Sequence, residues 1–178
     1  MSVGRVEQIV GPEPREATFA SSAIRLSCSV APWPGQLRRY PALLAMSEYR
    51  SSWWSIDLLS GWAADEQVEC VAFVRDDGVG ALQISSYEHD SGTVPAGDLD
   101  DFTEGEFPDG ATLEPVTCGV LSGVGVDYVA DGNFWLKRWL HKGTLLVYAT
   151  YNCDAADRDY ELPDVNRMLA TLKSTGAG

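Results

Sequence analysis

Histidine is nearly absent from this 178-residue chain, which contains only His89 and His141. Its four cysteines form no CxxC pair, and neither histidine stands at zinc-finger spacing. Structural zinc sites need such ligands close together in the sequence. We therefore expect no metal site.

Motifs of catalysis are also missing. Ser60 in "LLSGW" and Ser122 in "VLSGVG" lie outside a G-x-S-x-G elbow, and "GVLSGVGVD" lacks the lysine and the following helix of a phosphate loop. His89, followed by Asp90, suggests acid–base chemistry, but it ends a predicted strand, and His141 lies in a predicted turn, so both are expected in solvent. The sequence predicts no catalytic residue and no cofactor.

Basic residues are few, with 13 lysines and arginines against 26 acidic residues and a net charge of -13. Residues 1–45 carry five arginines and three glutamates (+2), which leaves 8 basic and 23 acidic residues (-15) for 46–178. Nucleic-acid binding depends on cationic surfaces that release counterions. No apolar run approaches the roughly 18 residues of a membrane span. Nucleic acid and membranes are therefore not expected partners.

Composition changes sharply at Met46. Residues 1–45 hold five of the nine prolines and no sustained apolar periodicity. We interpret them as a disordered leader, which is either a genuine flexible arm or, as we favour, sequence upstream of a true start at Met46. A single domain is expected over 46–173, followed by a flexible tail at 174–178.

The number of cysteines indicates the cellular compartment in which the protein is expected. Without the leader three cysteines remain, which cannot all pair, so we expect reduced, mostly buried thiols and a cytoplasmic location. The competing interpretation makes Cys28 in "RLSC" a lipid-anchored residue, but Arg25 stands where an apolar residue belongs, and no apolar signal segment precedes it.

From Trp53 onward, period-two alternation and β-branched or aromatic enrichment predict a succession of strands. "DGN" and "HKG" predict tight hairpin turns, so the last three strands should form an antiparallel meander. The strands are expected at 53–58, 68–75, 81–89, 112–118, 125–131, 134–141 and 144–153.

Two segments have helical periodicity. Pro95 opens the first, in which Leu99 and Phe102 are one turn apart, and the second runs over 161–173 with apolar residues at helical spacing. The acidic run "DLDDFTEGEFPD" lies mainly on the first helix, and we interpret it as a solvated face rather than a calcium site, because it lacks the alternation of an EF-hand loop. The predicted fold class is α+β, an antiparallel sheet of about six to seven strands with two helices packed on it.

This order, with "WSIDLLSGW" at its head and "LLVYATY" before a terminal helix ending "MLATL", resembles the Mog/PsbP-like superfamily over about 46–173, and is closest in character to its small bacterial members. Known members include a nuclear-import factor, photosystem subunits, bacterial lipoproteins and type VI secretion chaperones. The resemblance implies binding rather than catalysis.

Alternation along "NFWLKRWLH" separates Phe134, Leu136 and Leu140 from an aromatic and cationic face. That second face is interpreted either as a binding face for a protein partner or, as we favour, as a face covered by one of the two helices. Trp53 and Trp54 should point to opposite sides of the sheet. The candidate partner-binding residues are Trp135, Trp139, Lys137, Gln83 and Tyr87.

Three functions stay open. The first is a non-enzymatic protein-binding or chaperone-like domain. The second is an immunity protein that neutralises a basic toxin, which the charge favours. The third is a small-ligand binder or enzyme with a pocket between sheet and helix, rimmed by Tyr87, His89 or His141.

Overall fold

The chain is α+β, and its sheets are antiparallel. A computed structural model describes residues 47–88, 99 and 102–175. No helix in this part of the chain is long and apolar enough to cross a membrane. The elements are β1 (Ser47–Arg50), β2 (Trp54–Leu58), β3 (Trp62–Glu66), β4 (Val71–Arg75), β5 (Gly80–Glu88), β6 (Glu114–Cys118), β7 (Leu121–Ala130), β8 (Asn133–Lys142), β9 (Leu145–Asp154), α2 (Arg158–Leu169) and β10 (Lys173–Ser174).

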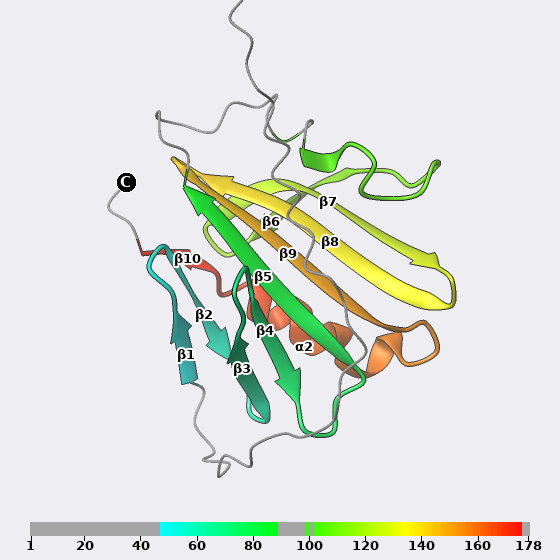
Figure 1. Cartoon of the computed structure of the whole chain (residues 1–178), viewed down its shortest axis with the longest axis horizontal. Helices are drawn as coiled ribbons and strands as arrows, with labels where there is room; N and C mark the ends of the chain where they lie inside the picture. The colour runs from blue at the N-terminus through cyan, green and yellow to red at the C-terminus, as the bar shows by residue number, and fades with distance from the viewer. Residues whose placement is uncertain (1–46, 89–98, 100–101, 176–178) are drawn as a thin grey trace, which may run out of the picture.

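A seven-stranded sheet forms the body of the molecule, in the order β3-β4-β5-β9-β8-β7-β6. Its long central strands lie side by side in Figure 1, with α2 across one face. The predicted meander is confirmed, because β7, β8 and β9 pair in succession. Asp131 (φ 51°) and Gly132 (φ 80°) form the β7–β8 turn with the left-handed backbone that such hairpins require.

The first predicted strand does not belong to this sheet. Strand β2 instead joins β1 and β10 in a separate three-stranded sheet, and β3 takes the edge position next to β4. Strands β1 and β3 were not predicted. Nearly all of their side chains are exposed, so neither strand has an alternation of apolar and polar residues. The segment "LSGW" is a turn, in which the Trp62 N–H donates to the Leu59 carbonyl at 3.1 Å.

The main core lies between one face of the seven-stranded sheet, helix α2 and strand β2. Trp54 enters it from β2, is 1% exposed, and donates from its indole Nε1 to the Ser86 hydroxyl of β5 at 3.0 Å. Its ring packs beside Tyr49 and Phe73, with ring centroids 5.6 and 6.3 Å away. Trp53, by contrast, is 39% exposed. The expected division of the paired tryptophans is therefore confirmed.

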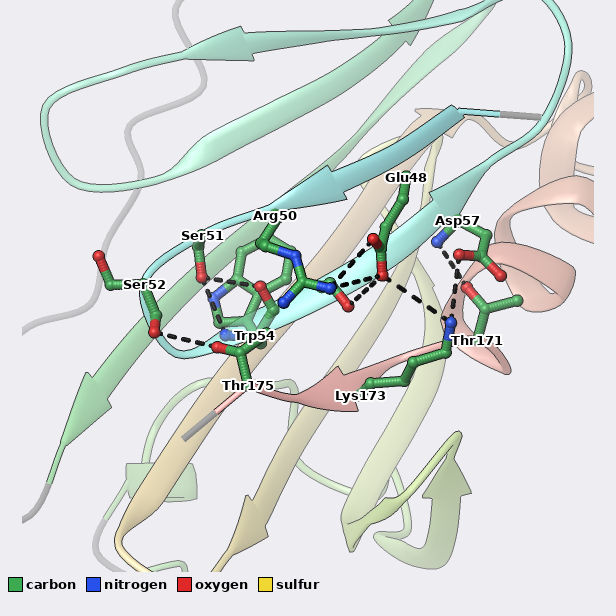
Figure 2. A network of polar contacts seen from close by, with 10 residues as sticks. Glu48, Arg50, Ser51, Ser52, Trp54, Asp57, Thr171, Lys173 and Thr175 are labelled. Carbon is green, nitrogen blue, oxygen red and sulfur yellow. Dashed lines mark hydrogen bonds and ion pairs between the residues drawn. The ribbon is translucent and has the colours of Figure 1, made fainter. Parts of the chain in front are cut away.

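Polar contacts join the first strands to the end of the chain (Figure 2). Glu48 accepts hydrogen bonds from the Ser55 hydroxyl at 2.8 Å and from Arg50 at 3.2 Å, and these contacts lower the pKa of its carboxyl. The Asp57 N–H donates to the Thr171 hydroxyl at 2.8 Å. The Glu48 contacts lie within the small sheet, and the Asp57–Thr171 bond joins that sheet to the turn that follows α2.

The C-terminal helix is displaced from its predicted span of 161–173. It begins at Arg158 and ends at Leu169, and Pro163 lies inside it. Beyond it, Ser174 pairs with Trp54, and the Thr175 N–H donates to the Trp53 carbonyl at 2.8 Å. The expected tail therefore contributes its first residue, Ser174, to the small sheet, and Thr175 bonds to the residue just before β2.

Within the described residues α2 is the one complete helix. The other predicted helix begins at Pro95, and its residues 95–98 and 100–101 lie outside the described part of the chain. Leu99, Phe102 and Thr103 have helical backbone.

Most of the glycine-rich run "GVLSGVG" lies in strand β7. Gly123 faces Leu140 in the ladder, and a Cβ built on it would lie 1.9 Å from the Trp139 carbonyl oxygen. Glycine is needed here because β8 approaches too closely for any side chain.

Replacing Trp54 by alanine should lower the free energy of unfolding by about 3–5 kcal/mol, because it empties a large buried site. Trp53→Ala is the matched control and should change it by less than about 0.5 kcal/mol. Urea denaturation of both variants measures the difference. Equal losses of unfolding free energy in the two variants would show that burial of Trp54 does not stabilise the core.

Candidate functional site

The face of the seven-stranded sheet opposite α2, called the second face below, carries the candidate binding residues. The ladder places Trp139 of β8 beside Tyr148 of β9 and Val124 of β7. Phe134, Leu136 and Leu140 point to the opposite side and are at most 3% exposed. The predicted separation of the two faces of this strand is therefore confirmed.

Part of the second face is covered. Trp139 is 2% exposed, stacks on Tyr148 with ring centroids 5.3 Å apart, and meets the Phe107 ring edge-on at 6.2 Å. Phe107 belongs to a chain segment, 102–113, that packs on this cluster. The buried residues, called the covered patch, are Leu99, Val126, Trp139, Leu146 and Tyr148.

An ion pair ties the covering segment to the sheet. The Lys137 ammonium donates to the Glu106 carboxylate at 3.0 Å and to the Glu106 carbonyl oxygen at 2.5 Å. Lys137 is 8% exposed, so its charge is withdrawn from the surface and satisfied by this one residue.

Beside the covered patch the second face stays partly open. Tyr128 and Trp135 face each other across β7 and β8, with ring centroids 6.4 Å apart and planes inclined by 15°. Asn152 lies next to Trp135 in the ladder, and Thr150 lies next to Gln83. All five side chains are half-buried. We call Tyr128, Trp135, Asn152, Thr150 and Gln83 the aromatic strip.

The five predicted partner-binding residues therefore divide. Trp135 and Gln83 lie on the aromatic strip, and Tyr87 is partly buried against the covered patch. Trp139 and Lys137 are buried and do not offer a surface to a partner, which corrects the prediction for these two. The covering element lies outside the run of strand residues, so alternation along β8 alone could not reveal it.

Sequence reasoning missed Tyr128, Thr150 and Asn152. Burial raises the pKa of the Tyr128 hydroxyl, which therefore stays a neutral donor and acceptor. These residues are found from their cross-strand neighbours: each lies beside another residue of the strip, which is visible only once the register of β5, β7, β8 and β9 is known.

The residues considered for catalysis are not assembled into a site. His141 is half-buried, and its Nδ1 has no hydrogen-bond partner within the described residues. Burial raises the pKa of the Cys118 and Cys153 thiols, which makes both poor nucleophiles. His89 lies outside the described residues. Among the residues that are described, no group of three or more histidine, cysteine or acidic side chains could hold a metal ion.

One buried carboxylate was not expected. Glu161 of α2 is 0% exposed and accepts hydrogen bonds from the Gly80 N–H at 3.0 Å and the Tyr151 hydroxyl at 3.1 Å. Its Oε1 has no partner within the described residues. Its two bonds join the helix to the start of β5 and to β9, so we assign it a role in fixing α2 on the sheet.

The cysteines differ from expectation at one position. Cys118 and Cys153 are free and buried, as predicted, whereas Cys70 is disulfide-bonded. Stable disulfides belong to oxidising compartments. The argument for a cytoplasmic location from reduced thiols therefore does not hold at Cys70.

Comparisons with known proteins identify the fold and no family. No protein-family model matches the chain, and no curated protein does. A crystal structure of a Bacteroides thetaiotaomicron protein is similar, with a TM-score of 0.53 and 16% identity, over 74% of this chain and 49% of that one. This chain thus spans about half the length of that protein.

A second solved structure is LpqN of Mycobacterium tuberculosis, described as involved in cell envelope biogenesis. Its TM-score is 0.45 with 12% identity, over 69% of this chain and 83% of that one.

Thiol labelling tests the cysteine arrangement. In unfolded but unreduced protein, iodoacetamide should modify Cys118 and Cys153 and leave Cys70 unmodified, and Cys70 should react only after reduction. Peptide mass spectrometry reads each position separately. Modification of Cys70 without reductant would contradict the disulfide.

Proposed function

We propose that the protein is a non-enzymatic protein-binding domain, of the kind found in chaperones, and that its partner docks on the aromatic strip. The observation that carries the proposal is the half-buried Tyr128–Trp135 pair, which lies on the sheet face next to a patch that is already covered.

The chemistry of the strip suits a protein partner. Tyrosine and tryptophan supply large contact areas at little cost in side-chain entropy, and binding hot spots are enriched in both. Lys137 lies 6.0 Å from the centroid of the Trp135 ring and is itself held by Glu106, which restrains that side of the strip. Asn152, Thr150 and Gln83 add donors and acceptors around the rings.

Charge indicates what kind of partner fits. Most of the domain's basic side chains already pair with its own carboxylates, so the surplus of acidic groups is left for solvent or a partner. A basic protein surface would be attracted to it. The seven paired residues, out of eight basic ones in 46–178, are Arg50, Arg75, Lys137, Arg138, Arg158, Arg167 and Lys173.

The same charge favours a second candidate, an immunity protein that neutralises a basic toxin. The two candidates differ in salt dependence. A toxin held mainly by charge should dissociate as ionic strength rises, whereas a partner held by the aromatic strip should be retained.

We also propose that the chain belongs to the Mog/PsbP-like superfamily. Support comes from an antiparallel sheet whose last long strand, β9, is followed by a helix that packs on it.

Site-specific photocrosslinking in the native cell tests the docking surface and captures the partner in the same step. A benzophenone amino acid in place of Tyr128 should crosslink to a discrete protein. The matched control replaces Tyr160, which is 54% exposed on α2, and should yield no such product. Trp135→Ala should then weaken the purified complex by at least about tenfold, as truncation of a binding hot spot does.

Equal crosslinking from both positions would contradict the proposal. So would a partner whose affinity is unchanged by Trp135→Ala.

A further inference from the structure

We propose that the free edge of strand β3 is a docking site for an extended basic segment of a partner protein, which adds to the seven-stranded sheet as an eighth strand. The site is distinct from the aromatic strip and does not depend on it.

The pairing pattern shows which backbone groups point outward. The Gln67 N–H donates to the Cys70 carbonyl at 2.9 Å, so these two residues form a hydrogen-bonded pair at the end of the β3–β4 hairpin. Antiparallel pairs alternate between bonded and non-bonded. Asp65 is therefore bonded to β4, while Ala64 and Glu66 direct their N–H and C=O groups away from it.

Those outward groups have no strand partner within the described residues. Strand β3 pairs with β4 alone among the described strands. Its register is continuous from Trp62 to Glu66, with no bulge, no proline and no lysine to block a further strand. Ala63 and Ala64 are exposed and small, which leaves room for the side chains of an incoming strand.

The acidic side chains at the β3 edge indicate that the segment that binds there is basic. Asp65 and Glu69 are exposed and make no ion pair within the described residues, and Glu66 is held only by the Tyr49 hydroxyl at 3.1 Å. An extended segment bearing lysine or arginine would pair with these carboxylates while its backbone bonds to Ala64 and Glu66. A second copy of this chain would bring the same acidic edge and be repelled.

Hydrogen exchange in the full-length protein, read by NMR, tests the site. The probe is a strand-length synthetic peptide that alternates lysine and valine. Its control alternates glutamate and valine. The basic peptide should shift and protect the Ala64 and Glu66 amides, and the acidic peptide should not.

Variants sharpen the test. Ala64→Pro removes an outward N–H that makes no bond to β4, and it should weaken peptide binding by about tenfold. Ala64→Thr keeps that N–H and favours a strand, so its affinity should stay within about twofold. If Ala64→Pro fails to fold, Asp65→Asn with Glu69→Gln serves instead and should lower affinity and its salt dependence.

Three results would overturn the proposal. The first is the absence of any effect at Ala64 and Glu66 up to millimolar peptide. The second is a response confined to Tyr128 and Trp135, which would place the peptide on the aromatic strip. The third is strong protection of the two amides in the free protein, which would mean that the edge is already occupied by residues 1–45 or by a second copy.

Discussion

Strands β8 and β9 are buried on both faces, and the rest of the structure follows from that constraint. In β9 the side chains from Leu145 to Ala149 are all buried, although neighbouring residues point to opposite sides. A sheet with such strands needs an apolar layer above and below. Helix α2 and the small sheet supply one layer. The segment 102–113 supplies part of the other.

The two layers cover different amounts of the sheet, and the candidate surfaces are the parts that they leave uncovered. The first layer extends from β2 to α2 and encloses the main core. The second covers Trp139 and stops short of Trp135, so the aromatic strip stays half-buried beside it. At the far side of the sheet, β3 carries exposed side chains on both faces after Trp62, and the first layer meets it there through the Tyr49–Glu66 hydrogen bond.

Sequence predicted the parts of this arrangement that depend on local pattern. The meander, the hairpin turns and the two faces of β8 follow from alternation and turn chemistry. Alternation also placed Trp53 and Trp54 on opposite sides, although it did not say which of them is buried. Strands β1 and β3 were missed because they bury almost nothing. The start of α2 was misplaced because its first three residues, 158–160, are all exposed and do not extend the buried apolar side of the helix.

The candidate site was harder to predict for a physical reason. Whether an aromatic side chain on a sheet face meets solvent depends on which distant segment packs over it. Phe107, which packs on Trp139, and Glu106, which pairs with Lys137, are each about thirty residues away from these partners in the sequence. Alternation assigned Trp135 and Trp139 to one face, and it was right. It could not tell that one of them is covered and the other half open.

Residue-resolved hydroxyl-radical footprinting of the native protein tests this division most directly, with oxidation of each tryptophan read by mass spectrometry. The two-layer account predicts that Trp53 and Trp135 are oxidised readily while Trp54, Trp62 and Trp139 are protected. Oxidation of Trp139 as fast as that of Trp135 would show that the second face is not covered, and would contradict the account.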